Sequence, residues 1–156
     1  MQFLNNALYV AAWSEELGEA PLGRTILNKP VALFRQSNGD PVALHDVCPH
    51  RFVPLSGGKV RGDTIECPYH GLRYGASGVC VLNPHGPAIP NRAKVKSYPI
   101  IEKYDAIWIW TGDSEPEGPE TIPDLTLHPS DVPQARYRGR THTLGNFQLE
   151  IGRAHV

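Results

Sequence analysis

The chain has 156 residues with a net charge of −1 at pH 7, and 40% of the residues are hydrophobic. This length suits one ordinary domain and the start of a second. A net charge near zero gives no electrostatic reason to expect nucleic acid or a membrane surface as partner, and no apolar run reaches the roughly 20 residues that cross a bilayer. The N-terminus lacks the basic region of a signal peptide, so we expect a cytoplasmic protein.

Short β-type runs dominate the chain before residue 111. Near the N-terminus we expect one short helix, with Ser14 as the cap of the run EEL. The expected strands, in chain order, are Thr25–Leu27, Val31–Arg35, the run PVALHDV, the run DTIEC, both halves of LRYGASGVCVL, and both halves of SYPIIEKYDAIWIW. Short strands at intervals of about 8–12 residues indicate an all-β sandwich or barrel.

The run CPHRFVPLSGGKVRGDTIECPYH holds two clusters of metal-binding residue types. The first is Cys-x-His, at Cys48 and His50, and the second is Cys-x-x-His, at Cys67 and His70. Three cysteines in a cytoplasmic chain argue against a disulfide framework and leave metal binding or free thiols. The 16 residues between the clusters are enough for a hairpin that returns both clusters to one point.

Two kinds of metal site compete for these residues. A structural zinc ion accepts two Cys and two His ligands, but zinc fingers usually pair Cys with Cys and His with His. The order found here suits two inequivalent metals, one held by two thiolates and the other by two imidazoles. That is the arrangement of a Rieske [2Fe–2S] cluster, whose potential is roughly −150 to +300 mV against about −400 mV for plant-type ferredoxins. The spacing favours the Rieske cluster, and zinc remains the alternative.

The chain resembles the Rieske non-haem iron oxygenases, and within them the oxygenase components of vanillate O-demethylases and dicamba-type demethylases. The resemblance rests on NNALYVAAWSEEL, PLGRTIL, CPHRFVPLSGG, CPYHGLRY, NPHG and YDAIWIWTGD, and it covers about residues 2–149. It implies an all-β Rieske domain of antiparallel sheets with a small cluster-binding subdomain, followed by the truncated start of an α+β catalytic domain. It also implies that Cys48, His50, Cys67 and His70 bind the [2Fe–2S] cluster.

The resemblance further implies an oxidoreductase that acts on an aromatic small molecule with O₂ in aromatic catabolism. A flavin- and iron–sulfur-containing, NAD(P)H-dependent reductase would supply electrons. The Rieske cluster would pass them to a mononuclear Fe(II), held by two histidines and one carboxylate in a separate domain. Family members are commonly homotrimers. Other readings are a standalone Rieske ferredoxin-type electron carrier, and a zinc-binding structural module.

We expect the Rieske domain over residues 1–112, a Pro-, Gly- and acid-rich linker over 113–123, and the start of the catalytic domain over 124–149. One coding of Ile151–Val156 matches a sequencing-adapter read-through, so we interpret residues 150–156 as an artefact on a longer parent. No catalytic residue is therefore expected in this fragment, and neither His142 nor His155 is expected to be an iron ligand.

Residues around the clusters suggest further contacts. His85 lies either close to the cluster loops or simply on a surface loop. Arg51, with Lys59, Arg61 and Arg73, either meets an acidic reductase surface or forms an ordinary solvated face. The backbone N–H groups of Arg51, Gly71 and Leu72 are expected to donate to the cluster sulfurs.

Overall fold

The residues that the structure describes form three antiparallel sheets, in agreement with the all-β domain of antiparallel sheets that the resemblance implies. The computed structural model describes residues 3–113 and 118–124. The predicted start of the catalytic domain and the residues interpreted as artefact therefore lie almost wholly outside the described residues. Within the described ranges, no helix has the length and apolar character needed to span a membrane.

Sheet A joins the first strand to the last hairpin, in the order β1-β11-β10. Strands β10 (Ile100–Lys103) and β11 (Ala106–Trp110) are the two halves of the predicted hairpin. Strand β1 (Leu8–Trp13), which was not among the predicted strands, pairs with β11. The hairpin turns at Tyr104 and Asp105, both with a φ of 57°, which is the geometry of a two-residue turn that matches strand twist.

Sheet B has the order β2-β3-β4-β9 and lies between the other two sheets in the packing. Its strands are β2 (Leu22–Ile26), β3 (Lys29–Arg35), β4 (Pro41–His45) and β9 (Ser97–Tyr98). Between the predicted strands Thr25–Leu27 and Val31–Arg35, the turn lies at Leu27 and Asn28, which adopt positive φ, and β3 already begins at Lys29.

Strand β3 shows why this sheet carries continuous apolar runs. Val31 and Leu33 belong to one buried cluster, and Ala32 and Phe34 belong to the other. Successive side chains of a strand point to opposite faces, so both faces of sheet B are covered. This explains the run VALF where a half-exposed strand would alternate with polar residues.

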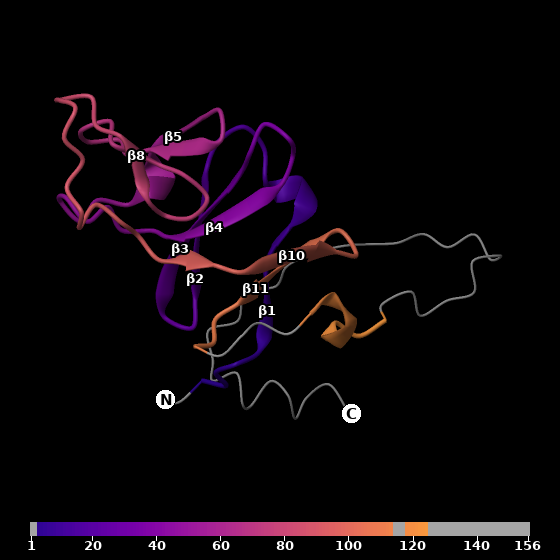
Figure 1. The fold of residues 1–156 in the computed structure, drawn as a ribbon. Helices are drawn as coiled ribbons and strands as arrows, with labels where there is room; N and C mark the ends of the chain where they lie inside the picture. The colour runs from indigo at the N-terminus through magenta and orange to yellow at the C-terminus, as the bar shows by residue number, and fades with distance from the viewer. Residues whose placement is uncertain (1–2, 114–117, 125–156) are drawn as a thin grey trace. The chain divides into compact units, whose positions relative to one another are not determined.

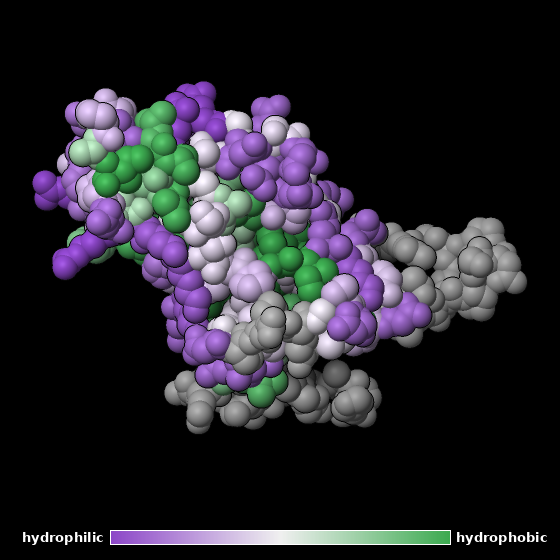
Figure 2. Space-filling model, viewed as in Figure 1, coloured by the Kyte–Doolittle hydropathy of each residue, from purple (hydrophilic) through white to green (hydrophobic). Residues whose placement is uncertain are grey.

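Sheet C, in the order β5-β6-β7-β8, is the small subdomain that the resemblance implies. Its strands are β5 (Lys59–Arg61), β6 (Thr64–Glu66), β7 (Arg73–Tyr74) and β8 (Cys80–Leu82). Figure 1 shows β5 and β8 at the upper left, away from β10 and β11. The loops before β5 and between β6 and β7 contain the four candidate ligands, and Figure 2 shows an apolar area near β8, whose Val81 and Leu82 are exposed.

Three short 3-10 turns complete the described residues: η1 (Ser14–Glu16), η2 (Leu55–Gly57) and η3 (Pro119–Thr121). The prediction that Ser14 caps a helix is wrong. Trp13 holds the cap position and its N–H donates to the Glu16 carboxylate at 2.9 Å. Turn η3 lies within the expected linker, next to Ile122, which is buried.

Candidate metal centre

Loop 1, which we define as Cys48–Val53, closes on itself through two backbone hydrogen bonds. The N–H of Cys48 donates to the Val53 carbonyl at 2.9 Å, and the N–H of Phe52 donates to the Cys48 carbonyl at 2.8 Å. Closing so tight a turn needs a left-handed residue, and Phe52 takes that conformation with a φ of 57°. Pro49 directly after the cysteine restricts φ and stiffens the turn.

Loop 2, defined as Cys67–Leu72, repeats this turn. The N–H of Cys67 donates to the Leu72 carbonyl at 2.8 Å, and the N–H of Gly71 donates to the Cys67 carbonyl at 3.0 Å. Here Gly71 is the left-handed residue, with a φ of 70°. Pro68 again follows the cysteine. The two loops are thus one backbone turn used twice, except that the histidine stands third in loop 1 and fourth in loop 2.

The two cysteine side chains meet in the core between sheets B and C. Cys48 is fully buried, Cys67 is 3% exposed, and both are free thiols. Burial raises the pKa of Cys67, the N–H groups of Tyr69 and His70 oppose the rise, and the neighbouring Cys48 thiol adds to it. Two adjacent buried thiols therefore need a cation to exist together as thiolates.

The Tyr74 hydroxyl lies 3.4 Å from the Cys48 sulfur. Tyr74 is completely buried, and burial, followed by the Cys48 contact, strongly raises the pKa of its phenol. The hydroxyl therefore keeps its proton and donates to Cys48 whenever that sulfur is a thiolate. No sequence pattern indicates this contact, since Tyr74 belongs to a run that predicts only a strand.

The two imidazoles lie side by side. The ring centroids of His50 and His70 are 4.6 Å apart with an angle of 50° between the planes. Nδ1 of His70 is buried without a hydrogen-bond partner. Desolvation, followed by the neighbouring charge of His50, lowers the pKa of His70, which favours the neutral imidazole that binds metals. An orphaned nitrogen of this kind fits a metal-facing atom.

The donor set fits two metals better than one. The two thiols neighbour each other, and so do the two imidazoles. A structural zinc site takes all four ligands at one ion, whereas a Rieske cluster takes only two protein ligands at each iron. The paired thiols and paired imidazoles therefore match the second case.

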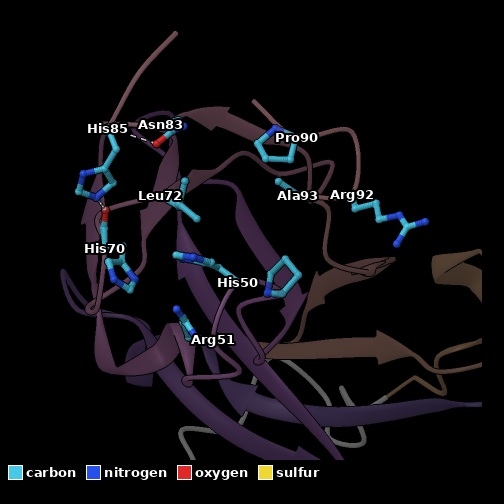
Figure 3. Close-up of a pocket in the computed structure, with 10 residues that line it drawn as sticks. His50, Arg51, His70, Leu72, Asn83, His85, Pro90, Arg92 and Ala93 are labelled. Carbon is cyan, nitrogen blue, oxygen red and sulfur yellow. Dashed lines mark hydrogen bonds between the residues drawn. The ribbon is translucent and has the colours of Figure 1, made fainter. Parts of the chain in front are cut away.

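A pocket of about 610 Å³ opens beside the two imidazoles (Figure 3). Its polar lining includes His50, His70 and Arg51 from the loops, and His85 and Arg92 from the segment that follows β8. This outcome supports the closer of the two placements considered for His85, whose Nε2 lies 3.0 Å from the His70 carbonyl oxygen.

One sequence-based expectation needs correction. The N–H of Gly71 donates to the Cys67 carbonyl, so it is not available to a sulfur, and the N–H groups that act on Cys67 are those of Tyr69 and His70. Of the basic residues around the loops, Arg73 and Arg61 pair with Glu66 at 2.8 and 3.6 Å. His142 and His155 lie outside the described residues.

Comparison with known proteins gives a consistent result. The Rieske [2Fe-2S] domain family matches residues 7–99. The chain is 53% identical over 152 residues to the oxygenase component of dicamba O-demethylase from Stenotrophomonas maltophilia, covering 97% of this chain and 44% of that protein. It is 39% identical over 150 residues to the vanillate O-demethylase oxygenase subunit of a Pseudomonas species, covering 96% and 42%.

Solved structures agree. The crystal structure of dicamba monooxygenase bound to dicamba superposes with a TM-score of 0.76 at 52% identity, over 80% of this chain and 38% of that one. The chain thus spans less than half the length of the relatives it matches.

Proposed function

This chain belongs to the Rieske [2Fe-2S] domain family, and from that membership we propose that it carries electrons through a cluster bound by Cys48, Cys67, His50 and His70. The two thiolates would hold one iron and the two imidazoles the other. The observation that supports the proposal is the repeated turn of loops 1 and 2, with one thiol of each loop beside the other in the core and one imidazole of each loop beside the other. When bound, such a cluster takes up and releases one electron at a time.

The residues around the proposed cluster would influence its reduction potential and the route of the electron. Tyr74 donates to the Cys48 sulfur, the N–H groups of Tyr69 and His70 face Cys67, and all of these donors stabilise negative charge on sulfur. The imidazole edges lie at the pocket, whereas the thiols lie in the core. Electrons would therefore enter and leave through the histidine side.

For the whole protein we propose an oxygenase component that hydroxylates or oxidatively demethylates an aromatic compound. The similarity extends over 97% of the chain, beyond the end of a lone Rieske domain, and this favours an oxygenase over a ferredoxin-type carrier. The parent would take electrons from an NAD(P)H-dependent reductase, hold a mononuclear Fe(II) in its catalytic domain, and act as a cytoplasmic homotrimer.

The cluster is tested by metal and sulfide analysis. The chain should contain two irons and two acid-labile sulfides and be coloured; a colourless protein with bound zinc would overturn the proposal. His70→Cys should keep a cluster, if one forms, at a lower midpoint potential, because a thiolate adds negative charge. His45→Gln is the control, since His45 lies outside both loops and contacts Tyr98 at 3.5 Å. An unchanged potential in His70→Cys would count against His70 as a ligand.

The parent activity is tested on the source gene. The reading frame should continue beyond Leu149 into a segment with two histidines and, later, an aspartate. The full-length product with its reductase should then consume O₂ in the presence of an aromatic ether. A native stop codon after Val156 would instead favour a standalone electron carrier.

A further inference from the structure

A buried carboxylate lies at the base of loop 1. Asp46 is 7% exposed and, among the residues that the structure describes, it is the one buried member of the Asp, Glu, Lys, Arg and His types. Burying a charge is costly unless hydrogen bonds compensate. A single such residue, two positions before Cys48, therefore needs a physical explanation.

Ser56 of η2 supplies the compensating hydrogen bonds. Its N–H donates to Oδ1 of Asp46 at 2.7 Å, and its hydroxyl donates to Oδ2 through a short hydrogen bond. The N–H of Asp46 in turn donates to the Pro30 carbonyl of β3 at 3.0 Å. A Cβ built on Gly23 of β2 would lie 2.8 Å from the Ser56 hydroxyl, so β2 closes over the pair.

These contacts close the segment between Asp46 and Ser56, which carries both Cys48 and His50. The segment's two ends are tied to each other by the carboxylate and to sheet B by the Pro30 contact. The positions of one candidate thiolate and one candidate imidazole therefore depend on this single side chain.

Within the part of the chain that the structure describes, Asp46 forms no ion pair. The field of a buried charge is screened less than that of a surface charge. Negative charge close to a redox centre opposes the addition of an electron.

We propose that Asp46 is a positioning residue of the cluster site, whose carboxylate clamps the base of loop 1 through Ser56 and whose buried negative charge makes the cluster harder to reduce. The inference rests on the proposed [2Fe–2S] cluster and goes beyond the four ligands. It assigns a tuning role to a side chain that touches neither metal nor sulfur.

The test compares midpoint potentials of two variants in the cluster-loaded protein. Asp46→Asn keeps the shape and removes the charge, so the ratio of reduced to oxidised cluster at a fixed applied potential should rise about three- to tenfold. Ser56→Ala keeps the charge and removes one of its two donors, so the same ratio should fall, by about twofold. A merely structural clamp would move both variants in the same direction, or neither.

Asp63→Asn is the matched control. Asp63 accepts the same two donors from a serine, the N–H and hydroxyl of Ser37 at 2.8 and 2.7 Å, but it is exposed. Its replacement should leave the potential unchanged, because solvent screens that charge.

The outcomes separate the two proposals. Wild-type protein without iron and sulfide would refute the proposed function itself. Wild-type protein with a cluster, whose Asp46→Asn and Ser56→Ala variants keep its potential or shift it the same way, would refute only the role of Asp46. If Asp46→Asn retains no cluster, the downward shift in Ser56→Ala decides alone: a fall supports the role and no fall overturns it.

Discussion

Loops 1 and 2 share one backbone turn and differ in two features that bear on the site: the left-handed residue and the position of the histidine. The left-handed residue is Phe52 in loop 1 and Gly71 in loop 2. Phe52 is 77% exposed, so its side chain extends into solvent, whereas a Cβ on Gly71 would meet Pro84 at 3.3 Å. The backbone pattern fixes the cysteines, and the local neighbours decide which other side chains each turn accepts.

The second difference is the register of the histidine, and changing it should have the largest effect. The double variant His50→Arg, Arg51→His gives loop 1 the register of loop 2. The third and fourth residues of one turn point in different directions, so the imidazole should no longer lie beside His70. We expect nearly complete loss of bound iron and sulfide, measured by chemical analysis.

Arg51→His alone is the control for this double variant. It makes the same change at position 51 but keeps His50, so its iron content should stay at the wild-type level. Full iron content in the double variant would show that either register can supply the ligand, and that the asymmetry between the loops has no chemical role.

The left-handed positions should give the next largest effect, on stability. Gly71→Ala should lower the free energy of unfolding by about 1–2 kcal/mol, because a Cβ is disfavoured at this φ. Phe52→Gly should raise it by up to about 1 kcal/mol, since it relieves the same strain at an exposed site. Urea unfolding of the cluster-loaded chain measures both.

Gly39→Ala separates the dihedral cost from the contact with Pro84. Gly39 has a φ of 91° and a Cβ there would meet nothing within 4 Å. Gly71→Ala should therefore cost more than Gly39→Ala. Equal costs would mean that the neighbour of loop 2 plays no part in requiring glycine.

The same contrast explains what could be predicted from the sequence. Cys48, His50, Cys67 and His70 could be proposed as ligands because their types and spacing are local. The structure places the two thiols beside each other and the two imidazoles beside each other. The contacts of Asp46 and Tyr74 could not be predicted, because no spacing pattern in the sequence indicates that Asp46 meets Ser56 or that Tyr74 meets Cys48. These contacts depend on how the chain folds back on itself.

Strands could likewise be predicted where the pattern was local, and not where a strand depended on a distant partner. The hairpin of β10 and β11 was predictable from alternating residues on either side of a short turn. Strand β1 was not, because its partner β11 lies almost a hundred residues away and its run LYVAAW has no strict alternation. The prediction for Ser14 was wrong because Trp13 occupies the cap position, where its N–H donates to the Glu16 carboxylate.

The two thiols receive different hydrogen-bond donors: the Tyr74 hydroxyl at Cys48 and two N–H groups at Cys67. The effect of the hydroxyl on the cluster can therefore be measured alone. Tyr74→Phe deletes the donor to Cys48 and leaves the N–H donors of Cys67 intact. A net loss of about 1 kcal/mol from the hydrogen bond corresponds to a fall of roughly 40 mV for one electron. The midpoint potential is read by spectroscopic titration.

Tyr98→Phe is the matched control for Tyr74→Phe. Tyr98 is also buried, and its hydroxyl lies 3.5 Å from His45 and not beside a sulfur. The midpoint potential of the Tyr98→Phe variant should equal that of the wild type. An equal fall in both variants would assign the effect to altered packing and not to the bond with Cys48.

The smallest effect should come from the ion pair that supports the sheets away from both loops. Arg35 binds Glu102 in a bidentate manner at 2.7 and 2.9 Å, and its hydrogen bonds lower the pKa of Glu102 to about 2. A carboxyl with a depressed folded-state pKa stabilises the fold above its unfolded pKa, and this contribution is lost as pH falls. Because the pair is partly exposed, we expect only about 0.5–1 kcal/mol.

Glu102→Gln should therefore be less stable than the wild type at neutral pH, and the difference should shrink between the unfolded value near 4.5 and about pH 2. Acid unfolding followed by far-ultraviolet circular dichroism in both proteins measures it. Iron content and potential should not change at neutral pH, because Glu102 belongs to β10 and contacts neither loop. A shifted midpoint potential in Glu102→Gln would mean that changes in the distant sheets alter the cluster site. The differences between loops 1 and 2 could then no longer be treated as local effects.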